Sequence, residues 1–500
     1  MRAPMLIPFI AIAIGVLTAL DGFGVWLGLA SVIAGVSLYL YILAARNQLT
    51  RFFRLSPLHY VWIAFCFCGI GNIAGNISSY NSPSPDLLNH IAAIEGTVEN
   101  IEEKAIGDIV SLECHRLYWE NGNPDSKNRF KVRMTVPAFT LNIGDRILFP
   151  ADKLREIKTS EKLDNTSYVK AMKERGFYYS IKISDNQITK VGHSLSLDYY
   201  SYDLRNKFVA FIEKQPLQSN TRNFLISVLS GDKTYLDDET RTLFANAGVA
   251  HILALSGFHI GIIGSILLLI LFPLNFAGKY KLRYFLTALL LWIYTFLTGF
   301  SPSLVRACTM ISVFILAMIL ERKNTALNSL CLAGFLILLF SPYSLLDVGF
   351  QLSFVCVGAL ILFSSHLNPI DYRFHPKLHN LAALILASII STTASWIIVA
   401  YHFHTFPINF LPANLLILPL MPIYILIALL YLCLRLFDID LYYIEILLNK
   451  LYDYALSFMK DLGEGTVLEV SPPGWTVVLW MAMLAVMAYF LNRKHYKPFT

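Results

Sequence analysis

From Asn246 to Ile260 the sequence reads Asn-Ala-Gly-Val-Ala-His-Ile-Leu-Ala-Leu-Ser-Gly-Phe-His-Ile, and a long apolar run follows. The stretch contains two histidines, His251 and His259, and the pair Ser256 and Gly257. Imidazole groups and a helix-loosening Ser-Gly pair are costly at membrane depth unless they face protein or a water-filled path. The stretch therefore predicts a helix that lines a polar path, rather than one that only anchors the chain in lipid.

The composition indicates a polytopic membrane protein. Of the 500 residues, 56% are hydrophobic and 15% are charged, and the mean hydropathy is +0.55. A soluble protein could not cover that much apolar surface, so this class is excluded. The net charge of +6 does not identify an anionic partner. Cytoplasmic loops of membrane proteins carry Lys and Arg for topological reasons anyway.

Eleven apolar runs can be read along the chain. They lie at roughly 6–20, 23–44, 58–77, 250–274, 284–299, 303–320, 325–340, 347–364, 380–401, 412–434 and 474–491. A membrane span needs about 20 apolar residues, so several of these runs are short and suit tilted, re-entrant or shielded helices. We expect about ten spans in total.

Basic residues between the runs predict the orientation. They are Arg2, Arg46, Arg51, Arg54, Lys279, Lys281, Arg283, Arg322, Lys323, Arg373 and Lys377. All of them fall on one side of the membrane if each run crosses once, and that side is the cytoplasm. The N-terminus is therefore expected inside and the polar segment 79–249 outside.

The last part of the chain departs from this simple pattern. Arg435 and the basic cluster 493–497 both favour the cytoplasm, although only one clear span separates them. We interpret 440–461, which carries charges on a Leu/Ile/Tyr-rich background, as an interfacial amphipathic helix. The run 412–434 contains three prolines, which favour a broken or re-entrant helix.

The polar segment contains short stretches with a period of two residues, which is typical of strands. Alternation occurs at 110–114, 130–136 and 177–183, and turn signals stand at 121–124 and 142–145. About five short strands suit a small closed barrel of the OB type. Residues 168–175 are expected to form a short helix inside this domain, and helical patterns return from 197 to 248.

A basic stripe is predicted on this domain. Arg129, Lys131 and Arg133 share one face of a strand, because successive side chains point to opposite faces. Together with the nearby Tyr118 and Trp119, they suit a surface that follows a phosphate backbone and stacks bases. The alternative is an ordinary solvated strand face.

Ser256 and His259 are one helical turn apart, and Asp232 and Lys233 lie upstream. One interpretation is the nucleophile and base of an intramembrane hydrolase. A general base normally comes from another element, however, and no third group orients this one. The other interpretation is a polar helix start whose imidazoles cap or hydrogen-bond locally.

Arg306 ends the motif Ser-Pro-Ser-Leu-Val-Arg near the outer end of a span. An arginine at membrane depth costs about 2.5 to 3.5 kcal/mol and usually pairs or lines a path. Asp347, at the outer start of another span and four residues before Gln351, is a plausible counter-charge. The alternative is that Arg306 snorkels to lipid head groups.

No metal or cofactor is expected. The chain has no His-Glu-x-x-His motif, and His402 and His404 lack the further ligands that zinc needs. Six of the seven cysteines lie in apolar runs, where they act as small hydrophobic residues. Cys114 alone lies in the polar segment, so no disulfide can form within it.

Five ordered blocks resemble the ComEC family of competence proteins, which form the inner-membrane channel for transforming single-stranded DNA. The blocks are Leu229-Ser-Gly-Asp-Lys233, Ala247-Gly-Val-Ala-His-Ile-Leu-Ala-Leu-Ser-Gly-Phe-His-Ile-Gly261, Leu297-Thr-Gly-Phe-Ser-Pro-Ser-Leu-Val-Arg-Ala307, Asp347-Val-Gly-Phe-Gln-Leu-Ser-Phe354 and Phe403-His-Thr-Phe-Pro-Ile-Asn-Phe-Leu-Pro-Ala-Asn-Leu415. The resemblance is strong over 220–435. Residues 1–195 resemble the N-terminal part of the family, in which a few spans precede an external OB-like domain.

The resemblance implies a fold class and a domain plan: a polytopic α-helical membrane protein with an inserted extracytoplasmic OB-like domain. The expected regions are N-terminal transmembrane helices at 1–78, the OB-like domain at 79–195, a helical connector at 196–249, the ComEC-type channel at 250–435, and an amphipathic segment and last transmembrane helix at 436–500. In this plan the protein lies in the cell inner membrane.

The resemblance also implies a function, the translocation of single-stranded DNA into the cytoplasm during natural transformation. The expected pathway residues are Asp232, Lys233, His251, Ser256, Gly257, His259, Arg306, Asp347 and Gln351. The OB-like domain would receive the strand through Arg129, Lys131 and Arg133. Partners implied by the family are an external DNA receptor, a cytoplasmic ATP-driven motor and a separate nuclease, and oligomers are compatible with it.

Many relatives carry a nuclease-like metallo-β-lactamase domain after the last spans, and its motif is absent from this sequence. We therefore expect no catalytic activity in this chain. Two alternatives stay open: an intramembrane hydrolase that uses Ser256 and His259, and a non-transporting anchor whose external domain binds a surface polymer.

Overall fold

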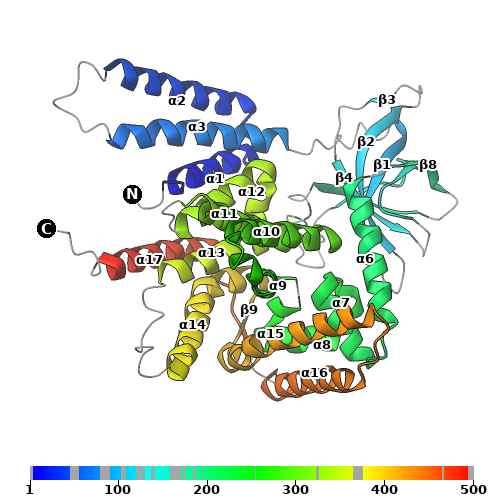
Figure 1. Cartoon of the computed structure of the whole chain (residues 1–500). Helices are drawn as coiled ribbons and strands as arrows, with labels where there is room; N and C mark the ends of the chain where they lie inside the picture. The colour runs from blue at the N-terminus through cyan, green and yellow to red at the C-terminus, as the bar shows by residue number, and fades with distance from the viewer. Residues whose placement is uncertain are drawn as a thin grey trace.

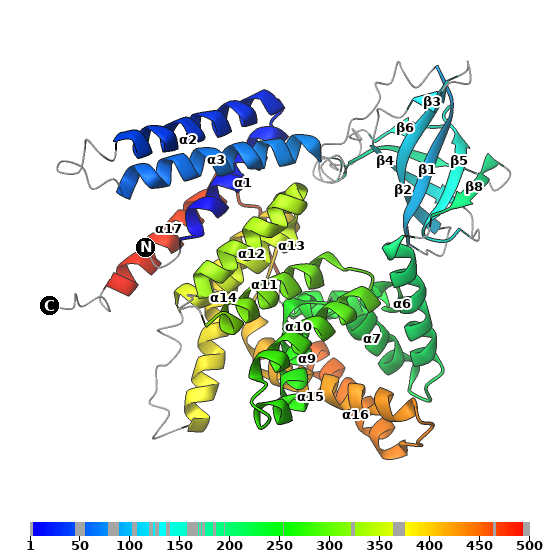
Figure 2. The same ribbon diagram turned by 45° about the horizontal axis from the view of Figure 1, so that its top comes forward.

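The structure is a computed structural model of the whole chain. It describes residues 4–45, 56–78, 90–102, 108–119, 124–125, 130–136, 141–157, 169, 172, 176–183, 187–194, 196–253, 255–321, 326–363, 376–463 and 467–493. A large helical body carries a β domain on one side, and the helix after the last strand of that domain leads back into the body (Figures 1 and 2).

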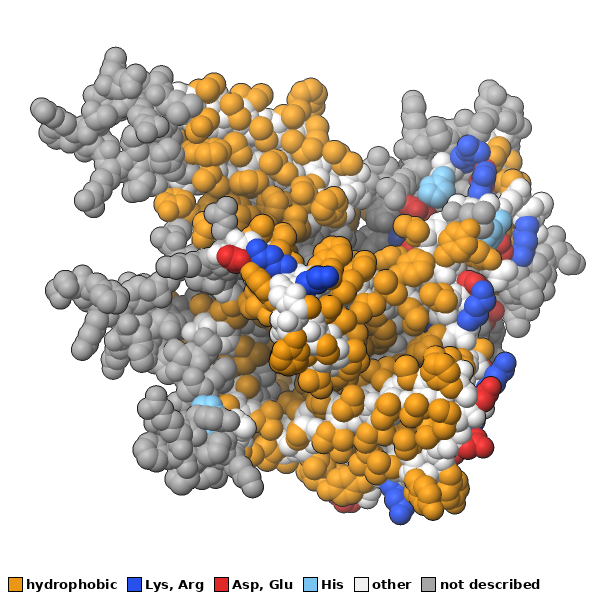
Figure 3. All heavy atoms as spheres, viewed as in Figure 1, with side chains coloured by type: hydrophobic (Ala, Val, Ile, Leu, Met, Phe, Trp, Pro, Cys, Tyr) orange, Lys and Arg blue, Asp and Glu red, His pale blue; other side chains and the backbone are white. Residues whose placement is uncertain are grey.

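Three helices form the N-terminal part: α1 (Leu6–Leu20), α2 (Val25–Ala45) and α3 (Ser56–Ile77). They pack closely because glycines stand where the backbones meet. A Cβ at Gly15 of α1 would overlap the carbonyl oxygen of Cys68 in α3, as is typical of membrane helices that associate through small residues. On the face shown in Figure 3, hydrophobic side chains cover most of the helical body, and most of the charged side chains lie on the side of the β domain and the helix that follows it.

The β domain is a mixed sheet. Its strands are β1 (Ile91–Glu102), β2 (Asp108–Trp119), β3 (Pro124–Asp125), β4 (Phe130–Val136), β5 (Asp145–Pro150), β6 (Arg155–Glu156), β7 (Phe177–Lys182) and β8 (Thr189–His193). The order is β6-β7-β4-β2-β1-β5-β8, with β3 paired to β2. Only β4 and β7 are parallel neighbours; the other paired strands of this sheet are antiparallel.

The alternation in the sequence correctly predicts which side chains are buried. Val110, Leu112 and Cys114 of β2 are at most 1% exposed and share the core with the apolar residues of β4. The pattern also holds in β7, except that Phe177 is only half-buried. The predicted turn at 142–145 is present: Asp145 N–H donates to Asn142 O, and Gly144 has φ 90°.

The expected closure of this sheet into a barrel is not found. Among the described strands the sheet ends at β6 and β8, and no ladder joins these two edges. The predicted turn at 121–124 and helix at 168–175 lie mostly outside the described residues.

The helical body begins with a connector and continues through the apolar helices. The connector holds α6 (Leu197–Glu213), α7 (Ser219–Ser230), η2 (Lys233–Tyr235), α8 (Asp238–Asn246) and η3 (Ala250–Ile252). The later elements are α9 (Gly257–Ile270), η4 (Phe272–Asn275), α10 (Tyr280–Leu297), α11 (Pro302–Ile319), α12 (Ala326–Phe340), η5 (Pro342–Leu346), α13 (Val348–Leu362), α14 (Pro376–Phe403), β9 (Thr405–Pro407), α15 (Phe410–Arg435), α16 (Tyr442–Gly463), β10 (Val467–Glu469) and α17 (Gly474–Arg493).

Four helices in the described part of the chain are long and apolar enough to cross a membrane: Tyr60–Ile77, Pro302–Ile319, His379–Phe403 and Phe410–Arg435. The shorter apolar helices, of 10 to 17 residues, are Leu6–Leu20, Val25–Leu40, Gly257–Ile270, Ala326–Phe340, Val348–Leu362 and Gly474–Leu484. Fewer than ten helices therefore reach full span length. Two of these stretches belong to longer helices, α2 with 21 residues and α17 with 20. Since a helix rises about 1.5 Å per residue, the others, which have 14 or 15 residues, cover less than the thickness of the hydrocarbon core.

The prediction of a broken helix at 412–434 is wrong. The helix α15 is continuous over 26 residues with Pro419 and Pro422 inside it. It packs with α16 and the connector in one core that includes Phe224, Tyr424 and Tyr452. This packing offsets the hydrogen bonds that the prolines remove.

The expected amphipathic helix at 440–461 is present as α16. Leu448 and Met459 are buried in the shared core, whereas Tyr443 on the same helix is 84% exposed. Arg435, at the end of α15, donates to Gln215 Oε1 at 2.9 Å and to Asp440 at 2.7 Å. Arg435 therefore lies beside the end of α6 and pairs there with Asp440.

A buried carboxylate ties three strands of the β domain together. Glu95 of β1 is 4% exposed, and it accepts hydrogen bonds from Arg146 of β5 and from the Tyr118 hydroxyl of β2, the latter at 2.8 Å. Arg116 lies 3.6 Å away. Burial alone would raise the pKa of Glu95, but these hydrogen bonds and charges hold it below its usual value.

Replacing Glu95 by Gln should therefore destabilise the sheet at pH 7 by about 1 to 3 kcal/mol, because the charge-assisted bonds to Arg146 are lost. A lowered pKa gives stability that is present above the unfolded value of about 4.3 and is lost as pH falls through the folded value. The difference between the Gln variant and the parent, measured by hydrogen exchange in β1, should shrink at pH 4. An equal difference at both pH values would contradict this role of Glu95.

Candidate functional site

The polar centre of the apolar helices is an ion pair between Arg306 of α11 and Asp347 at the start of α13. Arg306 Nη1 donates to Asp347 Oδ2 at 2.7 Å, and only 8% of the arginine side chain is exposed. Asp347 also caps α13, since the Phe350 N–H donates to the same oxygen at 3.2 Å. The counter-charge suggested by the sequence is therefore present, and Arg306 faces protein instead of snorkelling to head groups.

The guanidinium of Arg306 lies directly over Gly349. A Cβ at this glycine would stand 2.6 Å from Arg306 Nη2 and 3.2 Å from Asp347 Oδ2, so a side chain there would displace the guanidinium. Arg306 Nε is buried and has no hydrogen-bond partner among the described residues. Gln351 donates to Leu345 O at 3.1 Å, which fixes it on the turn before α13. The pair thus leaves one strong donor of a buried cation unsatisfied, which is costly in this environment.

Ser256 and His259 form the start of α9. The Ser256 N–H donates to His259 Nδ1 at 3.2 Å, and Ser256 Oγ lies 2.9 Å from the same nitrogen. His259 is 1% exposed. Because Nδ1 accepts a backbone N–H, a neutral ring carries its proton on Nε2. That atom is buried without a partner in the described part of the chain.

This geometry bears on the two interpretations of the Ser/His pair. Local capping is present, since His259 receives the N–H of the residue that precedes α9. A hydrolase would need a group that orients the imidazole through its second nitrogen. His259 Nε2 has none among the described side chains. The capping interpretation accounts for the contacts that are made.

The starts of α9 and α11 touch each other. A Cβ at Gly257 would lie 3.5 Å from Ala307 Cβ, the residue next to Arg306. Leu255, Ile260 and Leu304 pack around this contact in one buried cluster. The structure therefore brings Ser256, Gly257, His259, Arg306, Asp347 and Gln351 to the adjoining starts of α9, α11 and α13. His251 lies in η3, close enough to His259 for an electrostatic interaction, and is exposed.

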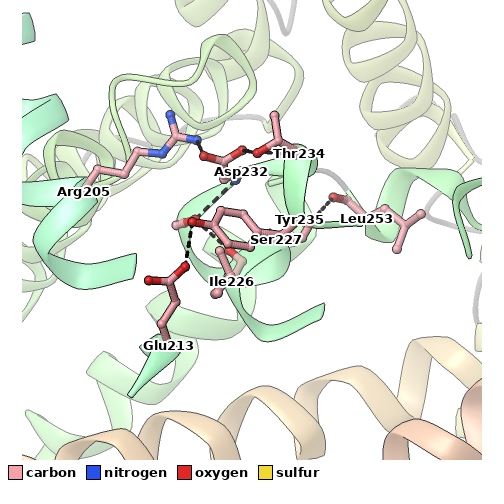
Figure 4. Close-up of polar contacts among 9 residues, drawn as sticks. Arg205, Glu213, Ile226, Ser227, Asp232, Thr234, Tyr235 and Leu253 are labelled. Atoms are coloured by element: carbon pink, nitrogen blue, oxygen red, sulfur yellow. Dashed lines mark hydrogen bonds and ion pairs between the residues drawn. The ribbon is translucent and has the colours of Figure 1, made fainter. Parts of the chain in front are cut away.

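Asp232 lies in a second polar cluster, between the connector helices (Figure 4). Its Oδ2 accepts from Arg205 Nη2 of α6 at 2.8 Å, and its Oδ1 accepts from the Thr234 N–H and hydroxyl at 3.1 and 2.6 Å. Arg205 was not predicted from the sequence, because its helix is amphipathic and its charges resemble a solvated face. The side chain of Lys233 lies outside the described residues.

The predicted basic stripe on the β domain is partly neutralised. Lys131 Nζ lies 2.5 Å from Glu99 Oε2, and the lysine side chain is 18% exposed. Arg133 is half-buried and contacts the sulfur of Met172. Arg129 lies outside the described residues. On its strand, Lys131 therefore belongs to a cross-strand ion pair, which weakens it as a phosphate ligand.

No metal centre is seen in the described part of the chain: no three His, Cys, Asp or Glu side chains converge there. All seven cysteines are free thiols. Cys114 is fully buried, and burial raises its pKa well above the usual value, so it is an inert core residue.

Comparison with known proteins gives one family match. A family described as "Competence protein" matches residues 228–494. This range includes the start of α9, the Arg306–Asp347 pair and Asp232, whereas Arg205, the partner of Asp232, lies before it.

Two known proteins are similar in sequence to part of this chain. The chain is 33% identical over 221 residues to "ComE operon protein 3" of Bacillus subtilis, covering 44% of this chain and 27% of that protein. It is 28% identical over 179 residues to "Recombination protein 2" of Haemophilus influenzae, covering 35% of this chain and 22% of that protein. The alignments thus span about a quarter of those two relatives. No solved structure matches the chain.

Replacing Gly349 by Ala should displace the Arg306 guanidinium from Asp347 and destabilise the protein by about 1 to 3 kcal/mol, the usual cost of overpacking. Gly358→Ala on the same helix is the matched control, since its Cβ would meet only Leu330 Cδ2 at 3.7 Å. Thermal unfolding of the purified protein measures both variants.

The origin of the effect is tested in an Arg306→Ala background. There Gly349→Ala should cost nothing further, because the group it displaces is absent. An equal loss in both backgrounds would mean that Gly349 serves packing unrelated to the ion pair.

Proposed function

The chain belongs to the competence protein family, and on this premise we propose that it is an inner-membrane channel that carries single-stranded DNA into the cytoplasm during natural transformation. Family membership, first indicated by the five sequence blocks, is confirmed by the match over 228–494. Membership supports a role in competence and DNA uptake. The channel, its substrate strand and its direction are the proposal.

The observation that carries the proposal is the buried Arg306, which an apolar helix would not otherwise hold. A guanidinium recognises phosphate with the same donors that it offers to a carboxylate. Asp347 therefore occupies, in the closed conformation, the place that a phosphate of the strand takes during passage. The unsatisfied Nε of Arg306 and Nε2 of His259 are further donors for such a ligand.

In this proposal the described conformation is a closed one. His259 is 1% exposed and Arg306 is 7% exposed, so no strand reaches them without movement of α9, α11 or α13. Exchange of Asp347 for a phosphate keeps the guanidinium paired, which lowers the cost of opening. Contacts of this kind must also be weak enough to release the strand.

The β domain, placed outside, would receive the DNA, and the N-terminus would lie in the cytoplasm. The sheet is not closed into a barrel among the described strands, so the support for strand binding is the half-buried Arg133 on β4 and its position on a domain that carries charged side chains. We propose further that the chain is a conduit without catalytic activity, which leaves strand degradation and the driving force to a separate nuclease and an ATP-driven motor. An external receptor would deliver the DNA.

Replacing Arg306 or His259 by Ala should abolish transformation by labelled DNA without lowering the amount of protein in the membrane. The reason is that the only buried donors proposed to meet the phosphates are removed. Lys281→Ala is the control, since Lys281 pairs with Glu321 and is half exposed. Normal uptake by both the Arg306 and His259 variants would refute the pathway.

The hydrolase alternative is favoured by one observation, the 2.9 Å distance between Ser256 Oγ and His259 Nδ1. Labelling with a fluorophosphonate probe distinguishes this hydrolase from a channel. A nucleophilic Ser256 would be labelled in the parent and not in Ser256→Ala, whereas the conduit should stay unlabelled in both.

The alternative of a non-transporting anchor that binds a surface polymer is tested by the salt dependence of binding. Each phosphate contact to a single strand contributes about −0.7 to the slope of log K against log salt. The full chain in nanodiscs should bind a single-stranded oligonucleotide with a steep slope, and Arg133→Ala should reduce that slope by about 0.7. Lys153→Ala, which removes an exposed charge paired with Gln187, is the control. A binding constant that does not change with salt concentration would favour an uncharged polymer as the ligand.

A further inference from the structure

The helix α6 joins the β domain to the helical body through contacts at both of its sides. On the side of the sheet, the Ser194 N–H donates to Gly144 O at 2.7 Å, and the rings of His193 and Tyr199 meet edge to face at 4.5 Å. His193 Nδ1 also lies 2.8 Å from Asp145 Oδ1. The first turn of α6 is thereby fixed to the start of β5 and to β8.

On the side of the body, α6 contacts the end of α10 and the loop after α7. The buried Ser201 hydroxyl donates to Phe296 O of α10. One turn further, Arg205 pairs with Asp232 at 2.8 Å, and both side chains are at most one quarter exposed. Figure 4 shows Arg205 reaching across from α6 to this carboxylate. The pair is therefore the charged part of the joint between the two units.

Asp232 uses its two oxygens for different partners. Oδ2 meets Arg205, while Oδ1 holds the N–H and hydroxyl of Thr234 and so forms an Asx turn. Tyr235, at the end of the same turn, donates its hydroxyl to Glu213 of α6 at 2.9 Å. The backbone conformation of η2, which includes Lys233, thus depends on the position of α6.

The turn also touches the candidate site. Gly231 ends α7 with φ 80°, and a Cβ there would lie 2.5 Å from Leu255 Cδ1. Leu255 directly precedes Ser256 and is 3% exposed. The Tyr294 hydroxyl donates to Leu229 O at 2.9 Å, which binds the end of α7 to α10. A shift of the turn would therefore reach the start of α9.

We propose that Arg205 is a positioning residue for the turn at 232–235, which it holds against the start of α9 while it neutralises Asp232. The inference rests on the proposed transport of DNA, because an unpaired carboxylate beside the site would repel a polyanion. Through α6, the same contact sets the position of the β domain relative to the site. Arg205 thus links the domain that would receive the strand to the helices that would pass it.

The turn can be monitored in the purified full-length protein by trypsin, which cleaves after Lys233. In Arg205→Ala, cleavage at this bond should be about tenfold faster, since the charge-assisted hydrogen bond that stabilises the closed turn is lost. Arg205→Lys keeps the charge and should restore a rate close to that of the parent. Lys207→Ala is the matched control: its partner Asp203 is on the same helix, and its side chain is 70% exposed.

Uptake of labelled single strands is then measured in cells with equal amounts of each variant in the membrane. Arg205→Ala should lower uptake about tenfold, because the unpaired Asp232 repels the strand beside the site, while Arg205→Lys and Lys207→Ala should stay near the parent. An unchanged cleavage rate in Arg205→Ala would overturn the positioning role. Faster cleavage with parental uptake would overturn it equally, because the turn would then have no bearing on transport. Failure of the channel itself would appear separately, as normal uptake in Arg306→Ala.

Discussion

Burial of one guanidinium constrains the apolar part of this protein. Arg306 is 7% exposed, and a cation in such a place is tolerated only when a carboxylate meets it with good geometry. Asp347 provides that carboxylate at 2.7 Å, and this requires α13 to begin beside α11. The pair in this geometry also favours a glycine at position 349, because a side chain there would displace the guanidinium. The arrangement of α11 and α13 therefore follows from the high cost of burying the Arg306 guanidinium without a counter-charge.

The same principle operates at two other levels of the molecule. In the β domain, Glu95 joins three strands by accepting from Arg146 and Tyr118. In the connector, Asp232 joins α6 to the loop after α7 by accepting from Arg205 and Thr234. Each buried or half-buried charge draws its partner from a different element, so each ion pair sets the position of two elements. In the proposed channel, a DNA strand that replaced one partner with phosphate would move both elements.

Periodicity and residue chemistry predict part of this structure. The alternation in β2 and β4 correctly identifies the core residues, since side-chain direction in a strand depends only on the local backbone. The Arg306–Asp347 pair could be anticipated because a charge in an apolar run restricts its possible partners. The continuity of α15 could not be anticipated, since prolines disfavour a helix locally. Packing of α15 against α16 and the connector stabilises the helix despite them. The pairing of Lys131 with Glu99 and of Arg205 with Asp232 depends on tertiary placement, which a single sequence does not specify.

The proposed channel requires DNA to pass between the adjoining starts of α9, α11 and α13. A photoreactive amino acid at Gln351, beside the ion pair, tests this directly when uptake of a labelled strand is arrested midway. Phe314, which is 47% exposed on the outer face of α11, serves as the reference position. The account predicts cross-links to the strand from position 351 and none from position 314. Equal yields at both positions, or none at 351 while uptake is arrested, would contradict a passage lined by these residues.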